Sequence, residues 1–230
     1  MCKNILDIKC TDENIFQIAT THPSFTTENN LSHLQNYERL EFFGDSVLKL
    51  YCSKILMEKF PEYDEGKLSK IRSILVSDAT ISQLGFKIGL NNIIRMAESE
   101  EKQGGRKRES NIACAMEAVI GAYYLDGKKE EIERFLKYNL NKYIEDIDNN
   151  FAKFNAKAVL QEYTQAKTKE LPEYETIAIT GPAHKPRFEV QVKYENKIIA
   201  TGFGSTKRDA QQDCAYKACI KLGIIEVKNE

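Results

Sequence analysis

The chain has 230 residues, enough for one core with a smaller domain or for two small domains. Its composition, 42% hydrophobic and 29% charged, is that of a soluble globular protein, and its longest apolar stretch is too short and too interrupted to span a bilayer. The formal net charge of -1 argues on its face against a nucleic-acid partner. It conceals an asymmetry, because residues 151–230 carry 13 Lys and Arg against 10 Asp and Glu, so that a mildly basic part follows an acidic one.

Residues 1–14 lack the long apolar core and the small-residue cleavage site of a secretory signal. The six cysteines form neither a CxxC pair nor a His/Cys cluster with the spacing of a zinc site. We therefore expect reduced thiols, a cytoplasmic location and no membrane partner.

The pattern up to about Asn150 is almost wholly helical. Tyr37–Phe60 repeats apolar residues at spacings of three and four and ends before a proline, which predicts a long helix. Residues 65–90 predict two more helices, the second capped by Ser77 or Asp78.

The next segment, residues 98–110, is polar, charged and contains Gly-Gly, so we expect an exposed and mobile loop there. Ser110 is expected to cap the following helix, which stops near Gly127. Residues 129–147 predict a further amphipathic helix.

The pattern changes after residue 155. A short helix is followed by three segments that alternate like strands and by a closing helix, which predicts a compact α+β module. We therefore expect a multidomain chain with an all-α domain over residues 1–150, a linker over 151–156 and a small α+β (α-β-β-β-α) domain over 157–225.

Three acids, Glu38, Glu41 and Asp45, lie on one face of the first long helix, at positions i, i+3 and i+7. Like charges at helical spacing destabilise a helix even when exposed, and buried ones need a cation. Gly44, which costs about 1 kcal/mol against alanine inside a helix, indicates that another backbone or a ligand packs close there.

Glu117 is an isolated acid in the apolar helix that follows Ser110, and tertiary packing could join it to the other three. Oxygen ligands that converge on one point are what magnesium requires. The alternative is that Glu38 and Glu41 are solvated helix surface, paired with Arg39 or Lys49.

Residues 37–48, YERLEFFGDSVL, resemble the signature of the ribonuclease III family, N-E-R-L-E-F-L-G-D-[AS]-[VI]-L. THPSF, EGKLSKIRSILVS and EAVIGAYYLDG match further family motifs in the expected order. The C-terminal module resembles a double-stranded-RNA-binding domain through LQEYTQAK, GPAHKPRFEVQV and GFGSTKRDAQQDCAYKA. The resemblance implies a homodimeric, Mg²⁺-dependent endonuclease, with Mn²⁺ as a possible substitute, that cuts double-stranded RNA in rRNA and mRNA processing and leaves 5′-phosphate and 3′-hydroxyl ends.

The resemblance also implies roles for single acids. Glu41, Asp45 and Glu117 match metal ligands of the catalytic centre. Glu38 and Glu65 match acids that line the same dimer valley, where they engage RNA or organise the site.

Cys114 departs from the family pattern S-I-L-A-D-x-x-E, because this chain reads SNIACAME and has a cysteine where the fourth ligand, an aspartate, is usual. A thiol with a pKa of about 8.5 is mostly neutral at pH 7, and its soft sulfur suits magnesium poorly. We predict weakened metal binding and slower cleavage. The alternatives are complete loss of activity, a shift toward manganese or zinc, or a small buried helix residue without chemistry.

In the C-terminal module the resemblance assigns residues to the grooves and phosphates of duplex RNA, which is read mainly through its shape and backbone. These are Gln161 and Glu162 for one minor groove, His184 for the next, and Lys207 and Arg208 for the phosphates. Gln211 stands where many family members have another basic residue, so we expect weaker electrostatic attraction to the RNA phosphates.

Three functions are compatible with these residues. The first is a metal-dependent endonuclease for duplex RNA. The second is an RNA-binding dimer whose nuclease centre is weakened or inactive because of Cys114. The third is a helical RNA-binding regulator without metal.

Overall fold

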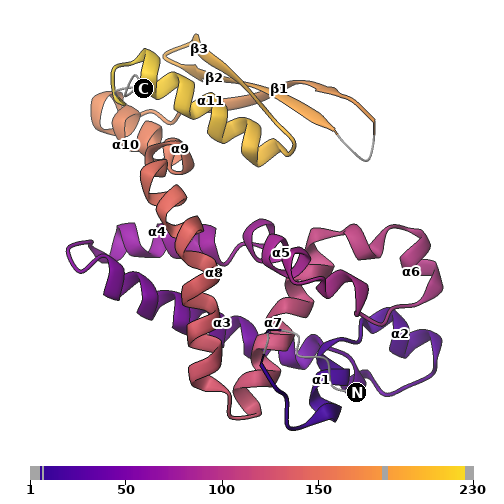
Figure 1. The fold of residues 1–230 in the computed structure, drawn as a ribbon. Coiled ribbons are helices and arrows are strands. Elements are labelled where there is room, and N and C mark those ends of the chain that lie inside the picture. The colour runs from indigo at the N-terminus through magenta and orange to yellow at the C-terminus, as the bar shows by residue number, and fades with distance from the viewer. Residues whose placement is uncertain (1–5, 7, 183–185, 226–230) are drawn as a thin grey trace. The chain divides into compact units, whose positions relative to one another are not determined.

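The computed structural model describes residues 6, 8–182 and 186–225 (Figure 1). The chain divides into two compact units, Met1–Asp146 and Ile147–Glu230, each with its own internal contacts. The division falls within one long helix, α8. Among the helices described, none is long and apolar enough to cross a membrane.

The first unit is built from helices, and within its described residues one isolated β-bridge pairs Thr21 with Arg95. Its elements are α1 (Glu13–Ala19), α2 (Pro23–Glu28), η1 (His33–Gln35), α3 (Glu38–Lys59), α4 (Glu65–Leu75), α5 (Asp78–Lys87), η2 (Leu90–Asn92), α6 (Glu98–Lys102), η3 (Gly105–Lys107), α7 (Glu109–Leu125) and α8 (Lys129–Asn149). The predicted long helix is α3, and the two helices predicted over residues 65–90 are α4 and α5.

The core of this unit is built around α7. Between Asn111 and Tyr123 the residues of α7 are buried on every side, with only Cys114 and Glu117 partly exposed. A helix that is apolar all round belongs in the interior of a domain. Helices α3 and α5 pack against it over long stretches, and Tyr123 donates a hydrogen bond from its hydroxyl to the carbonyl of Ile8 at 2.8 Å.

Most of residues 98–110 are exposed, as predicted, but the prediction of an irregular loop is wrong, because the segment contains α6 and η3 and buries Gly105. Ion pairs hold it in place. The Glu100 carboxylate accepts from Arg108 at 2.6 Å and from the side-chain amide of Asn111 at 3.0 Å. The predicted cap is also wrong, since α7 already begins at Glu109 and Ser110 lies within it.

The cysteines are not all reduced thiols. Cys52, Cys114, Cys214 and Cys219 are free. Cys10 is disulfide-bonded, so the expectation of reduced thiols is wrong for that residue.

The second unit contains the expected order of helix, strands and helix. Its elements after α8 are α9 (Phe151–Phe154), α10 (Ala156–Thr168), β1 (Glu173–Thr180), β2 (Arg187–Tyr194), β3 (Lys197–Gly204) and α11 (Lys207–Lys221). Within the described residues the strands form one antiparallel sheet in the order β1-β2-β3. The segment assigned to a linker, residues 151–156, is mostly helical here, as α9 and the first residue of α10.

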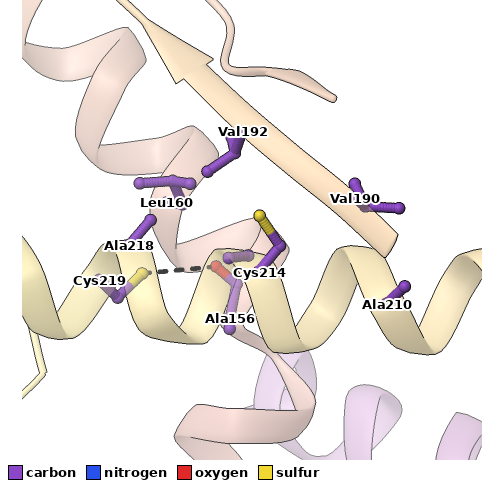
Figure 2. Close-up of a cluster of buried hydrophobic side chains, with 9 residues drawn as sticks. Ala156, Leu160, Val190, Val192, Ala210, Cys214, Ala218 and Cys219 are labelled. Atoms are coloured by element: carbon purple, nitrogen blue, oxygen red, sulfur yellow. Dashed lines mark hydrogen bonds between the residues drawn. The ribbon is translucent and has the colours of Figure 1, made fainter. Parts of the chain in front are cut away.

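The core of this unit lies between the sheet and the two helices α10 and α11 (Figure 2). Leu160 of α10, Val190 and Val192 of β2, and small residues of α11 such as Cys214 and Ala218 are all buried. The small side chains let α11 approach the sheet closely. At Gly202 of β3 an added Cβ atom would lie only 2.2 Å from the backbone nitrogen of Cys214, so glycine is required there.

Candidate active site and RNA-binding face

Helices α3 and α7 touch backbone to backbone where they cross. A Cβ atom added to Gly44 of α3 would lie 1.8 Å from the carbonyl oxygen of Glu117. One added to Gly121 of α7 would lie 2.6 Å from the carbonyl oxygen of Leu40. The prediction that another backbone packs against Gly44 is therefore confirmed, and the crossing sets the acids of α3 beside those of α7.

Glu117 lies among like charges at this crossing. Burial, followed by the nearby charges of Asp45 and Glu41, raises the pKa of the Glu117 carboxyl to about 8. The pKa of Glu41 is raised as well, mainly by burial and in part by its acidic neighbours. A carboxyl group that is half-buried beside two other acids therefore keeps its proton at neutral pH, and a cation bound beside it would favour the charged form.

Asp45 is the acid of this group with a basic partner. Lys49, one turn further along α3, donates to its Oδ2 at 2.6 Å. The Lys49 charge also lowers the pKa of Glu117, although less than burial and the acids raise it. The alternative paired Glu38 or Glu41 with Arg39 or Lys49, whereas the ion pair described for Lys49 is with Asp45.

Cys114 faces the same acids from α7. Burial, together with a hydrogen-bonding interaction with Glu41 and the charges of Glu41 and Glu117, raises the pKa of the Cys114 thiol to about 12. The thiol is therefore neutral at physiological pH and adds no negative charge. Cys114 and Glu117 are also the two residues of the central part of α7 that are left partly open.

Asp78 is a member of the acidic group that the sequence analysis missed. It is the first residue of α5, and its charge raises the pKa of Glu41, Cys114 and Glu117. From the sequence it resembled a helix cap, because acids are common in a first helical turn. Only the packing of α5 against α7 reveals its position.

The remaining two acids lie at helix starts. Glu38 is exposed in the first turn of α3, where its backbone N–H donates to Asn36 at 3.0 Å and its charge acts on Glu41. Glu65 is exposed at the start of α4, and its Oε1 accepts from Ser69 at 2.7 Å. Glu38 thus joins the acidic group, whereas the contact described for Glu65 is local.

The donor set fits a hard divalent cation in its chemistry. Glu41, Asp45, Glu117 and Asp78 offer oxygen ligands, which Mg²⁺ and Mn²⁺ prefer, and the raised pKa of Glu41 and Glu117 shows that the site lacks positive charge. Within the described part of the chain, however, no three His, Cys, Asp or Glu side chains are already arranged to hold a metal ion. The acids therefore supply the right atoms and charge without a closed ligand cage.

The second unit presents polar residues on α10 and α11. Gln161 and Glu162 are exposed on α10, and Lys207 and Arg208 are exposed in the first turn of α11. Thr206 caps α11 by accepting from the N–H of Asp209 at 3.1 Å. His184, which was expected in the loop between β1 and β2, lies outside the described residues.

Comparisons with known proteins agree with this architecture. A family model described as Ribonuclease-III-like matches residues 12–144, and one described as double-stranded RNA binding motif matches residues 156–222. A protein of Fusobacterium nucleatum named Ribonuclease 3 is 34% identical over 96% of this chain and 97% of its own length. A Ribonuclease 3 of Wolbachia pipientis is 38% identical over 95% of this chain and 94% of its own length.

A solved structure resembles the first unit. It is the nuclease domain of ribonuclease III from Campylobacter jejuni, with a TM-score of 0.53 and 34% identity, covering 62% of this chain and 90% of that one. A second structure of that domain, described as flexible in a region involved in dimer formation, has a TM-score of 0.52 and 35% identity and covers 56% of this chain and 87% of its own.

Proposed function

Because the chain belongs to the ribonuclease III family and is an endoribonuclease, we propose that it hydrolyses phosphodiester bonds of double-stranded RNA with the help of a divalent metal ion. The proposed products carry 5′-phosphate and 3′-hydroxyl ends, and the proposed substrates are structured rRNA and mRNA precursors. The observation that carries the proposal is the crossing of α3 and α7, which sets Glu41, Asp45 and Glu117 against one another.

In the proposed site Glu41, Asp45 and Glu117 hold Mg²⁺, with Mn²⁺ as a substitute. When bound, the metal would lower the pKa of a water ligand and stabilise the charge that develops on the phosphate. The acids contribute oxygen ligands, and their excess charge favours a divalent cation at this place. To bind the metal, Asp45 would give up its ion pair with Lys49. The Lys49 ammonium would then be available to an RNA phosphate.

The test is cleavage of a long RNA duplex by the purified chain in Mg²⁺ and in Mn²⁺. Glu117→Gln should lower the cleavage rate by about 100-fold or more with either metal. The change removes a carboxylate ligand and keeps the shape of the side chain. Glu109→Gln is the matched control, since it removes an exposed acid from the first turn of the same helix and should leave the rate unchanged. Equal rates for the two variants would contradict the assignment.

A second candidate function is a duplex-RNA-binding dimer with a weak or inactive nuclease centre. The neutral thiol of Cys114 and the engaged carboxylate of Asp45 favour it, because both lower the number of charged ligands ready for a metal. Retarded migration of the RNA duplex in a gel, with no products in Mg²⁺ or Mn²⁺, would support this function and exclude the first.

We propose that the active species is a homodimer formed through α3. Phe42, Leu50 and Met57 are 80%, 58% and 64% exposed, and their spacing of 8 and 7 residues puts them on one face of that helix. Large apolar side chains gathered on one exposed helix face mark an interaction site. The partner is a second copy, in keeping with the dimer-forming region of the Campylobacter nuclease domain.

A cytoplasmic location is proposed because rRNA and mRNA precursors are found there and because four described cysteines are free thiols, which suits a reducing compartment. Cys10, by contrast, is disulfide-bonded.

A further inference from the structure

Gln211 lies where the family resemblance predicts a third basic residue in the first turns of α11. A basic side chain from another helix, that of Lys157, is hydrogen-bonded to it. Its side-chain Oε1 accepts a hydrogen bond from Nζ of Lys157, at 2.6 Å. Lys157 comes from α10, 54 residues earlier in the chain. Gln211 itself follows Lys207 by one helical turn, so the Lys157 ammonium is brought to the face of α11 that carries the basic pair.

Contacts from two elements, α11 and β1, fix Lys157 at this place. Its backbone N–H, in the first turn of α10, donates to Oε1 of Gln212 on α11 at 3.1 Å. Its Nζ lies 4.8 Å from the centre of the Tyr174 ring on β1, a cation–π distance. A long lysine side chain that is held by an amide and an aromatic ring loses less freedom when it then binds an anion.

Lys157 lies near two cations, and no carboxylate partner of it is found among the described residues. Burial lowers the pKa of the Lys157 ammonium, and the charges of Arg208 and Lys207 lower it further, which places both of them nearby. The partners that the structure describes for Lys157 are amide oxygens and a ring, not an acid. Clustered cations repel one another in the free protein, and a polyanion relieves that repulsion.

We propose that Lys157 is a phosphate-binding residue for duplex RNA and that it supplies, from α10, the positive charge that α11 lacks at Gln211. The Gln211 amide positions the Lys157 ammonium beside Lys207 and Arg208. Lys157 is one turn before Gln161 on α10, so it lies between the residues proposed for the minor groove and those proposed for the phosphates. The inference rests on the proposed binding of double-stranded RNA.

The test measures how binding weakens with salt. Each neutralised phosphate of a duplex contributes about 0.9 to the slope of log affinity against log salt. The full chain would be titrated with a fluorescent RNA duplex of about 20 base pairs, longer than the roughly 16 that such a domain spans, in a chelator that prevents cleavage. Lys157→Met should reduce the slope by about one, and Lys157→Arg should keep it.

Lys221→Met is the matched control, because Lys221 is exposed in the last turn of α11, roughly 20 Å along the helix from Lys207. It should leave the slope unchanged. Gln211→Met should weaken binding but keep the slope, since it removes the positioning amide and not the charge.

The outcomes separate the inference from the proposed function. A slope for Lys157→Met equal to that of the unchanged chain would overturn the inference alone, even if affinity fell through loss of folding. Equal losses of affinity in Lys157→Met and Lys157→Arg would overturn it too, because they would show a purely structural role. Failure of the unchanged chain to bind the duplex would overturn the proposed function as well.

Discussion

Cys114 occupies a position beside Glu41 and Glu117 at which a carboxylate would add a ligand for the proposed metal ion. Its thiol is neutral, so Cys114→Asp should raise the cleavage rate at limiting Mg²⁺ by about 10-fold or more. Cys114→Ser is the matched control, since it removes the sulfur without adding charge and should bring no such gain. Rates would be measured on an RNA duplex over a range of Mg²⁺ concentrations, together with the rise in melting temperature caused by the metal. Equal cleavage rates and equal metal-induced rises in melting temperature for the two variants would refute a role for this position in metal binding.

Glu117 makes the metal-free protein sensitive to pH. Its folded-state pKa of about 8 exceeds the ordinary value of 4.5, so between these values the folded protein keeps a proton that the unfolded chain has lost. Folding stability therefore falls as the pH rises through this window, and below it Glu117 makes no difference. We expect Glu117→Gln to stabilise the metal-free protein by about 2 kcal/mol at pH 8 and not at pH 4.

Urea unfolding of both proteins at the two pH values, in a chelator, measures this effect. Adding Mg²⁺ at pH 8 should stabilise the unchanged chain more than Glu117→Gln, since the metal neutralises the same charge. A stability difference that is the same at both pH values would contradict the burial of Glu117 among acids.

The packing of α3 against α7 is the contact between elements on which the site depends. Gly44→Ala would put a methyl group 1.8 Å from the Glu117 carbonyl, so the helices must separate, at a cost of about 3 kcal/mol. The control is Gly66→Ala in α4, where the added carbon comes no closer than 3.5 Å to Asp64. That change should stabilise the protein by about 0.5 kcal/mol, because alanine favours a helix. Urea unfolding measures both effects, and unaltered stability with full cleavage in Gly44→Ala would disprove the close crossing.

At the scale of the whole molecule, the exposed face of α3 predicts a homodimer. Phe42→Glu puts a charge on the most exposed of the three apolar side chains of this face and should convert the protein to monomers in sedimentation velocity. Tyr138→Glu is the matched control, because Tyr138 on α8 is 82% exposed and is equally aromatic. A dimer that survives Phe42→Glu but dissociates with Tyr138→Glu would place the interface on α8 instead.

Much of the fold follows from patterns along the chain, whereas the order of residues 98–110 and the place of Asp78 among the acids depend on contacts that no such pattern shows. The spacing of apolar residues predicted α3, α4, α5 and the alternating strands, because the apolar residues of each element recur at the period of its buried face. The segment over residues 98–110 was mispredicted as a loop, because its order depends on Glu100 meeting Arg108 and Asn111. Polar composition alone does not reveal whether charged residues find partners.

The sequence by itself determined which elements form and which atoms could bind a metal or RNA, because side-chain period and chemical type are local properties. It also indicated, through Gly44, that a close approach would occur on α3. Only the tertiary structure decided that the approaching backbone is that of Glu117, that Asp78 joins the acids and that Lys157 reaches Gln211. Such pairings depend on distances between residues far apart in the chain, and packing of whole helices sets those distances.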